Sequence, residues 1–256
     1  MKILITNDDG IKSPGLRAIV DAIHQDAECL VVAPHQEKSA TAHSISLYGE
    51  IWVEFVNMGD GLKGYSVEGT PADCVKFAFA ELLKKKVDLI ISGINLGLNT
   101  GVSVYYSGTV SAAREGLING VPAIAVSQGK QQTRDFSCAT KLISQLIRAH
   151  KESHIPKDTF LNINIPPVAP KDVKGVRITK QAHSRFDEWY EEVKKSGSNG
   201  RKPYQVRGDI EMLTSDGTSD EEAIREGYVS ITPLLLDSTH YDQMSHFKKW
   251  VKDYSI

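Results

Sequence analysis

The sequence predicts an α/β protein with a mostly parallel β-sheet that is covered by helices on both faces. In the first half of the chain, short apolar segments alternate with segments that carry apolar residues at helical spacing. Strands that are apolar throughout are buried on both faces, as they are in parallel sheets. The 256 residues are 41% hydrophobic and 24% charged, which is typical of a globular chain and not of a disordered one.

The expected elements of the first half have recognisable boundaries. Pro14 lies in the first turn of one predicted helix, where proline is tolerated. Thr70 and Asp73 stand three residues apart at the start of another, in the positions of a capping box. Strands are expected at residues 2–6, 29–33, 50–56, 64–67, 88–91 and 122–126, and helices at 14–24, 70–85, 108–117 and 133–150.

The alternating pattern weakens after Pro166, where further prolines predict a loop. Apolar segments at 176–181 and 205–213 predict strands on either side of a polar stretch at 194–203. We interpret this region as a long hairpin extension or a loop. A strand at 228–232 and a helix at 241–251 complete the expected elements. The chain is therefore expected to be a single domain over 1–256, with a core at 1–165 and an extension at 166–256.

Composition excludes several classes of protein. The formal net charge of −2 makes binding to a nucleic-acid duplex improbable, because that binding depends on phosphate neutralisation. The cysteines, Cys29, Cys74 and Cys138, are odd in number and scattered, which excludes a disulfide framework and zinc spacing and suits a reducing compartment. The apolar run near Met1 is too short for a signal peptide, so we expect a cytoplasmic protein.

The stretch 89–113 carries no charged residue and is long enough for a membrane span. It contains four glycines, two asparagines and several serines, however, and this content is too polar for lipid. We therefore expect no membrane association. An uncharged segment rich in glycine, asparagine and serine is more typical of backbone that is shaped around a ligand.

Asp8 and Asp9 follow directly on the first predicted strand, at the sheet edge where doubly wound proteins bind ligands. Adjacent carboxylates repel each other unless positive charge lies nearby, and a hard divalent cation prefers such oxygen ligands. Two interpretations are open at this point. The acids either hold a metal ion or simply favour the start of the helix at Pro14.

Other candidate residues follow the second and third strands. Ser39 is a possible ligand or phosphate contact, and His35 and His43 lie close to it in sequence. Asn95 and Asn99 lie in a glycine-rich loop and offer neutral oxygen ligands. Each has an ordinary structural alternative, because serine and asparagine also form turns and most histidines are not catalytic.

Ser107, Gly108 and Thr109 stand directly before a predicted helix, where free N–H groups and the helix dipole favour a phosphate. Ser107 also suits a simple N-cap, and the two roles are compatible. Taken together, Asp8, Asp9, Ser39 and Asn95 can surround Mg²⁺ or Mn²⁺ beside this phosphate site. This inventory is typical of a metal-assisted phosphate hydrolase.

Two other function classes compete with this interpretation. The first is a non-catalytic nucleotide or phosphate sensor, which needs no metal; the paired Asp8 and Asp9 argue against it. The second is a nucleotide-sugar transferase, which usually needs a second domain that this chain is short for.

Five motifs, which follow one another in a fixed order along the chain, resemble those of a known family. They are Asn7-Asp8-Asp9-Gly10, Ala33-Pro34 through Ser39-Ala40, Gly69-Thr70-Pro71-Ala72-Asp73-Cys74-Val75, Ser92-Gly93-x-Asn95-x-Gly97-x-Asn99 and Ser107-Gly108-Thr109-Val110. Together they strongly resemble the SurE family of stationary-phase survival proteins, which are metal-dependent 5′-nucleotidases. The resemblance is close over the first half of the chain and holds only in outline over the second.

The resemblance implies a Rossmann-like three-layer α/β/α core, with a β-hairpin extension and a C-terminal helical segment that serve oligomerisation. It implies one divalent metal ion per subunit, Mg²⁺ or Mn²⁺, held by Asp8, Asp9, Ser39 and Asn95. Our own hypothesis for the mechanism is that the catalytic residues are Asp8 and Asp9, one or the other of which orients or deprotonates the attacking water. Phosphate contacts are implied for Asn99 and for Ser107, Gly108 and Thr109. The implied substrates are 5′- and 3′-nucleoside monophosphates and short polyphosphate, and the implied assembly is a homodimer or homotetramer.

Overall fold

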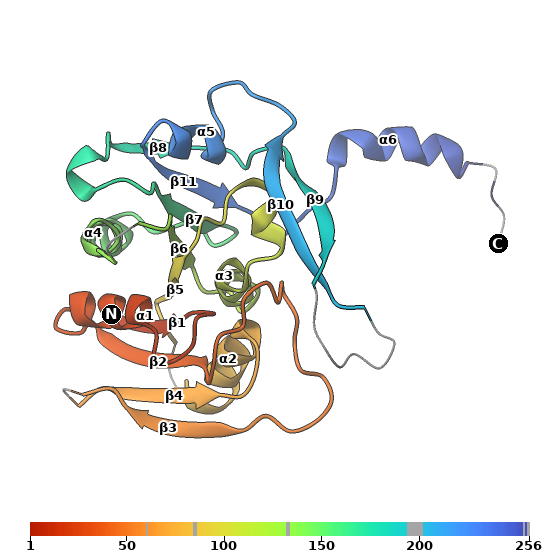
Figure 1. Ribbon diagram of the computed structural model, residues 1–256. Helices are drawn as coiled ribbons and strands as arrows, with labels where there is room; N and C mark the ends of the chain where they lie inside the picture. The colour runs from red at the N-terminus through yellow and green to blue at the C-terminus, as the bar shows by residue number, and fades with distance from the viewer. Residues whose placement is uncertain (60, 84–85, 132–133, 194–201, 253, 255–256) are drawn as a thin grey trace.

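The computed structural model describes residues 1–59, 61–83, 86–131, 134–193, 202–252 and 254. Within these residues a nine-stranded sheet forms the centre of the molecule (Figure 1). Its spatial order is β3 (Val53–Asn57), β4 (Lys63–Val67), β2 (Glu28–Pro34), β1 (Lys2–Thr6), β5 (Leu89–Leu96), β6 (Ala123–Gln128), β7 (Phe160–Ile165), β11 (Val229–Leu234) and β8 (Val176–Ile178). The pairs β3–β4 and β7–β11 are antiparallel, and the other pairs are parallel.

The direction in which strands are added changes between β1 and β5. From β1 the chain builds outward through β2 on one side, and from β5 it builds outward through β6 and β7 on the other. β1 and β5 are themselves paired, in register from Ile3 with Leu89 to Thr6 with Ser92. Ligands of doubly wound sheets bind beyond the carboxyl ends of the strands at such a switch point.

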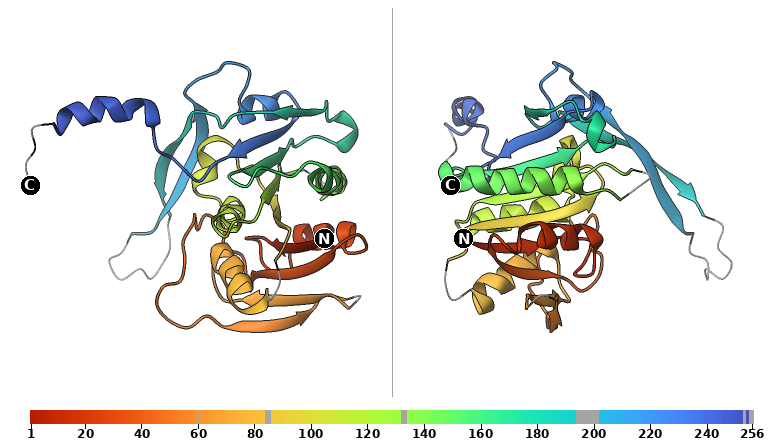
Figure 2. Two further views of the ribbon diagram at one scale, coloured as in Figure 1. Left: turned by 180° about the vertical axis from the view of Figure 1, so that it is seen from behind. Right: turned by 90° about the vertical axis from the view of Figure 1, so that its left-hand side faces the viewer.

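Helices cover both faces of the sheet, so the predicted three-layer α/β/α architecture is confirmed. One face carries α1 (Pro14–Ile23) and α4 (Ser137–Glu152), which lie side by side in Figure 2, and the other carries α2 (Pro71–Phe77) and α3 (Gly108–Ile118). Two apolar clusters fill the space between the layers. The central residues of β1 divide between them, because alternate side chains of a strand point to opposite faces.

The predicted helix starts are confirmed in atomic detail. The Ser13 hydroxyl accepts a hydrogen bond from the Leu16 N–H at 3.2 Å and caps α1, with Pro14 at its first position. At α2 the Asp73 N–H donates to the Thr70 hydroxyl at 3.1 Å, and the Thr70 N–H donates to the Asp73 carboxylate at 2.9 Å. The capping box expected from the sequence is therefore complete.

Two predicted helices have different bounds in the structure. After α2 the chain widens into a π-helical turn at Ala78–Leu82, and Leu83 leaves the helical conformation. The helix therefore ends before the predicted limit of residue 85, which lies outside the described residues. The long helix α4 begins at Ser137 instead of residue 133, which is also outside the described residues. The Asp135 carboxylate accepts the Ser137 N–H at 2.8 Å, and this side-chain contact precedes the first helical turn.

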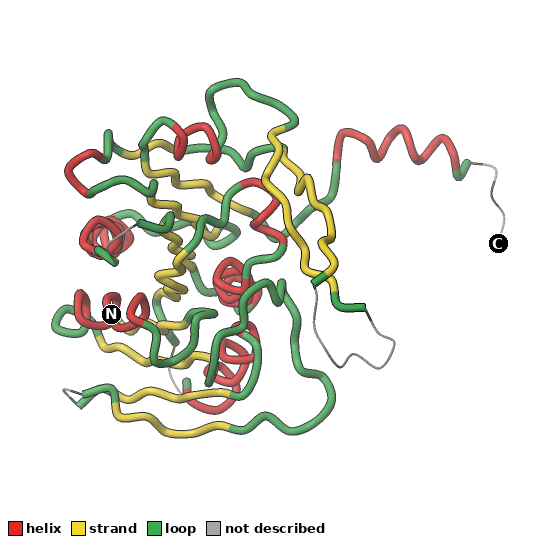
Figure 3. Tube along the Cα trace, viewed as in Figure 1, coloured by secondary structure: helices red, strands yellow, loops and turns green. Residues whose placement is uncertain are grey.

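The second half differs most from expectation. The predicted strand at 176–181 is shortened to β8, which joins the main sheet (Figure 3). The hairpin is formed instead by β9 (Ser184–Glu192) and β10 (Tyr204–Met212). β9 consists mainly of charged and aromatic residues and is exposed almost throughout, so it lacks the apolar pattern of a buried strand. Residues 194–201 of the predicted loop lie outside the described residues.

Three further elements complete the fold. β7 and the short helix α5 (Asp220–Arg225) were not predicted from the sequence. The C-terminal helix was, and α6 (Tyr241–Trp250) extends away from the body of the molecule (Figures 1 and 2) with every residue exposed. A search of the described helices finds none with the length and apolar content needed to cross a membrane.

Gly15 tests how closely α1 packs on β5. A Cβ atom at this position would lie 2.1 Å from the carbonyl oxygen of Ile94, so alanine requires the backbone of one element to move. We expect Gly15→Ala to lower the free energy of unfolding by about 3 kcal/mol in urea denaturation. Helix propensity alone predicts the opposite sign, a gain of about 1 kcal/mol. A stabilised variant would contradict the close approach seen here.

Candidate functional site

The turn after β1 presents two carboxylates at the switch point of the sheet. The Asn7 side-chain amide donates to the carbonyl of Gly10 at 3.0 Å and to the Ser13 hydroxyl at 2.6 Å, which closes the turn. Gly10 has φ of +99°, a conformation that side chains other than glycine rarely adopt. These contacts fix the backbone from which Asp8 and Asp9 project.

The N-terminus of α3 packs directly against Asp8. The Thr109 hydroxyl donates to the Asp8 carboxylate. A Cβ atom on Gly108 would lie 2.8 Å from the Cβ of Asp8, so only glycine permits this approach. Asp8, which was predicted from the sequence to bind a metal ion, is therefore adjacent in space to Gly108 and Thr109, which were predicted to bind a phosphate.

Both carboxylates are in surroundings that disfavour their charge. Burial raises the pKa of Asp8 above its ordinary value. Burial, together with the charges of Asp8 and Glu37, raises the pKa of Asp9 to about 7, and Arg134 only partly opposes this. A pair of buried acids beside a third is costly when ionised, and a cation removes that cost. The donor chemistry of this turn therefore fits a divalent metal ion.

The two neutral members of the predicted metal set make local contacts in this structure. Ser39 is exposed, and its hydroxyl donates to the Glu37 carboxylate at 2.5 Å. The Asn95 amide donates to the carbonyl of Gly97 at 2.8 Å. Within the described ranges no three His, Cys, Asp or Glu side chains are grouped to hold a metal ion. The four-residue set of two carboxylates, a hydroxyl and an amide stays a prediction.

Asn99 and Ser107 are held in place by other parts of the protein. Asn99 is buried, its backbone N–H donates to the Asn164 side chain at 2.7 Å, and its amide donates to the Ser127 hydroxyl at 2.7 Å. The Ser107 hydroxyl accepts the Val110 N–H at 3.1 Å and caps α3. The capping interpretation of Ser107 is thus confirmed, and the phosphate contacts of both residues stay predictions.

Neither histidine near Ser39 faces the acid pair through a hydrogen bond. His35 Nδ1 lies 3.1 Å from the Ser66 hydroxyl. His43 Nε2 lies 2.9 Å from the buried Glu115 carboxylate on α3. Because the Ala42 N–H also donates to the carbonyl of Tyr106 at 3.0 Å, the segment that follows Ser39 is tied to the residues just before α3 and to α3 itself.

Acidic residues of α5 hold the glycine-rich loop, and the sequence analysis missed them. The Gly101 N–H donates to the Asp220 carboxylate at 3.0 Å, and the Thr100 hydroxyl donates to Glu221 at 2.7 Å. Two signals were available. Ser219 is followed three residues later by an acid, which is the pattern of a capping box, and the apolar strand β7 carries two asparagines.

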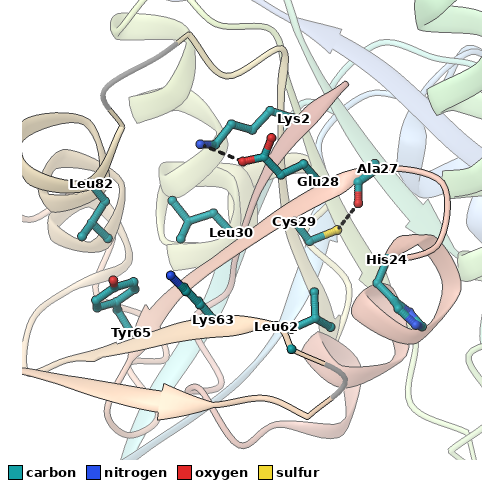
Figure 4. A pocket seen from close by; sticks show the side chains of 11 residues that line it. Lys2, His24, Ala27, Glu28, Cys29, Leu30, Leu62, Lys63, Tyr65 and Leu82 are labelled. Atoms are coloured by element: carbon teal, nitrogen blue, oxygen red, sulfur yellow. Dashed lines mark hydrogen bonds and ion pairs between the residues drawn. The ribbon is translucent and has the colours of Figure 1, made fainter.

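Asp9 lines an open cleft of about 420 Å³ on the same edge of the sheet, with His35, Glu37, Lys130 and Arg134 among its other walls. A second cavity of about 480 Å³ lies at the opposite edge, where the strands begin (Figure 4). An ion pair of 3.1 Å between Lys2 and Glu28 crosses it. Of the two acids, Asp9 lines the first cleft, whereas Asp8 and the residues of α3 are not among its walls.

Fold and site define a class of protein: a doubly wound α/β protein that brings paired acids and a helix N-terminus together at its switch point. The sequence model of the family described as "Survival protein SurE" matches residues 3–188 of this chain. The chain belongs to the SurE family, as the motifs predicted.

Relatives and a solved structure match over the full length. Proteins named "5′-nucleotidase SurE" from Desulfatibacillum aliphaticivorans and Pelotomaculum thermopropionicum are 42% and 43% identical to it, over 98% and 100% of this chain and 98% and 97% of theirs. The crystal structure of the SurE protein from Aquifex aeolicus is 33% identical and has a TM-score of 0.83, and the match covers 99% of this chain and 100% of that one.

The raised pKa of Asp9 predicts how the stability of the metal-free protein depends on pH. The folded state keeps this proton up to about pH 7, whereas the unfolded chain loses it near the ordinary pKa of 3.8. The free energy of unfolding should therefore fall as pH rises from about 4 to about 7, and the partial exposure of the Asp9 carboxylate to solvent limits the loss to about 1–2 kcal/mol.

Asp9→Asn isolates this contribution from those of other titrating groups. Urea denaturation across the same pH range, in the presence of EDTA, should show a shallower decline in the variant than in the natural sequence. Identical pH dependence in the two proteins would contradict the assignment.

Proposed function

We propose that this chain is a metal-dependent 5′-nucleotidase that hydrolyses nucleoside monophosphates to nucleoside and phosphate. The observation that carries the proposal is the contact between Asp8 and the N-terminus of α3 through Gly108 and Thr109. This contact supports the proposal because it brings a residue proposed to bind a cation next to residues proposed to bind an anion. The relatives named above are nucleotidases by name, and the matches extend over nearly the whole chain.

Asp8, Asp9, Ser39 and Asn95 would hold one Mg²⁺ or Mn²⁺ per subunit. All four offer the oxygen ligands that these ions prefer, and the raised pKa values of the two acids supply the reason to bind a cation. When bound, a divalent ion supplies positive charge to the phosphoryl group and lowers the pKa of water.

Residues of the chain itself would position the reacting groups, activate the water and stabilise the phosphoryl oxygens. Asp8 is buried, and its carboxylate accepts a hydrogen bond from the Thr109 hydroxyl, so this carboxylate has a fixed position in the site. Asp9 lines the cleft, so its carboxylate would orient the attacking water and accept its proton. The N–H groups at the start of α3, around Gly108 and Thr109, would stabilise the negative charge of the phosphoryl oxygens, and Asn99 would add a contact.

The substrates that suit this site are small. We propose 5′- and 3′-nucleotides and short polyphosphate, and neither a nucleic-acid duplex nor a membrane surface. The net charge of −2 does not favour a long polyanion such as a nucleic-acid duplex, whereas a local cation and a helix N-terminus suffice for a terminal phosphate group. A sensor without catalysis leaves the charges of Asp8 and Asp9 unexplained. The free thiols of the described cysteines support our proposal of a cytoplasmic location.

Asp9→Asn should abolish phosphate release from AMP, by at least about 100-fold in kcat, because the variant lacks a carboxylate that orients and deprotonates water. EDTA should stop the reaction of the natural sequence, and added Mn²⁺ or Mg²⁺ should restore it. Colorimetric phosphate release over a panel of mononucleotides measures both effects.

Glu37→Gln is a matched control, because it removes a neighbouring negative charge but no proposed ligand. It should retain turnover, and its metal-free form should melt at a higher temperature than the natural sequence. Near-normal turnover by Asp9→Asn, or full activity in EDTA, would contradict the mechanism.

We further propose that the chain assembles as a homodimer or homotetramer through the hairpin and the C-terminal helix. The side chains of Tyr241, Phe247 and Trp250 on α6 are more than half exposed, and Met244 is nearly so. An amphipathic helix without a covered face gains little stability unless its apolar side chains are buried against a partner.

Replacing Phe247 and Trp250 by glutamate should reduce the assembly to monomers in light scattering, because the buried apolar area is lost and charge is added. The fold of each subunit should survive, since α6 is exposed along its whole length. Lys248→Glu on the same helix is the control and should leave the mass unchanged. A double variant that keeps its oligomeric mass would contradict the role of α6.

A further inference from the structure

Two aromatic side chains from distant segments meet beside the N-terminus of α3. Tyr106 and Phe186 have ring centroids 5.5 Å apart and an interplanar angle of 53°. Tyr106 is 49% exposed and Phe186 is 38% exposed, so the pair is not part of the core. Exposed aromatic rings that are held in fixed positions are typical of binding surfaces.

The backbone around both rings is fixed relative to the site. Tyr106 immediately precedes Ser107, the N-cap of α3. Its N–H donates to the carbonyl of Ser103 at 3.1 Å, and its own carbonyl accepts the Ala42 N–H at 3.0 Å. The first residue of the hairpin, Ser184, accepts the Val102 N–H at 2.9 Å, which anchors the strand that carries Phe186.

Figure 1 shows the resulting arrangement, in which the base of β9 lies against the segment that leads into α3. The hairpin is an extension from the second half of the chain, and this contact brings one of its aromatic residues to the edge of the proposed phosphate site. Tyr106 is therefore one residue along the chain from Ser107, the first of the residues proposed to bind phosphate, and Phe186 reaches the same place through its contact with Tyr106.

This position matches the shape of a nucleoside monophosphate. A phosphate at the start of α3 leaves the nucleoside outside the helix terminus, and its base needs an apolar surface within the length of a ribose. Aromatic rings stack on every base because each base has a π-face, so such a surface contributes affinity without strict base selection. Neither ring carries a charge that would repel or select a base.

We propose that Tyr106 and Phe186 form an aromatic platform on which the base of the substrate stacks. The inference rests on the proposed nucleotidase function and extends it from the phosphate to the base. It assigns a binding role to the hairpin, and it predicts that affinity depends on the presence of a base more than on its identity.

The test compares AMP with ribose 5-phosphate, which keeps the sugar and the phosphate and lacks the base. Binding is measured by calorimetry and turnover by phosphate release, for the natural sequence and for Phe186→Ala and Tyr106→Ala. Each variant should weaken AMP binding and raise its KM about tenfold, while the values for ribose 5-phosphate change by less than about twofold. The unchanged values also show that the variants are folded.

Two control variants sharpen the result. Tyr106→Phe keeps the ring and should behave like the natural sequence. Trp189→Ala removes an exposed aromatic residue from the same strand of the hairpin, three residues beyond Phe186, and should leave AMP binding unchanged.

The outcomes are distinguishable. Equal losses for AMP and ribose 5-phosphate, or no loss for either, would overturn the platform and leave the nucleotidase function in place. No binding and no phosphate release with any substrate of the natural sequence would overturn the nucleotidase function, and the platform with it.

Discussion

The contact between Asp8 and the start of α3 is the constraint on which the site depends. It joins the end of the first strand to a helix one hundred residues later, through one hydroxyl and one glycine. Burying a carboxylate there is unfavourable by itself, and its partner Asp9 adds further negative charge. The apolar sheet and the helices that cover it fix the backbone around the two acids, and the protein therefore tolerates their unfavourable burial. Functional sites commonly concentrate such unfavourable groups.

The loops that surround the acid pair are held by distant segments. Asn164 on β7 and two acids of α5 fix the glycine-rich loop, whereas Glu115 on α3 and the carbonyl of Tyr106 fix the segment after Ser39. Loops with little secondary structure of their own thereby obtain defined positions. Catalytic sites need such fixed positions, because a displacement of about an ångström can lower the rate of a reaction by about a hundredfold.

Much of the fold and the site could be predicted from the sequence because the strongest signals are local. Apolar strands, the helix start at Pro14, the cap at Thr70 and the acid pair after β1 depend on neighbours in the chain, and all appear where expected. The helical pattern did not indicate that α2 passes into a π-helical turn at Ala78–Leu82, and β9 is a strand through pairing with β10 and without an apolar pattern. Asp220 and Glu221 clamp the glycine-rich loop by accepting hydrogen bonds from its residues. These bonds join positions more than a hundred residues apart, and no local pattern in the sequence predicts them.

The clamp on the glycine-rich loop also bears on biosynthesis. Domains generally fold as units during or after synthesis. The loop around Thr100 and Gly101 precedes its partners Asp220 and Glu221 by about 120 residues, so the ribosome makes the loop well before it makes them. The loop therefore lacks these hydrogen bonds until residues 220 and 221 have been translated, and a chain that stalls before them cannot fix the loop in this way.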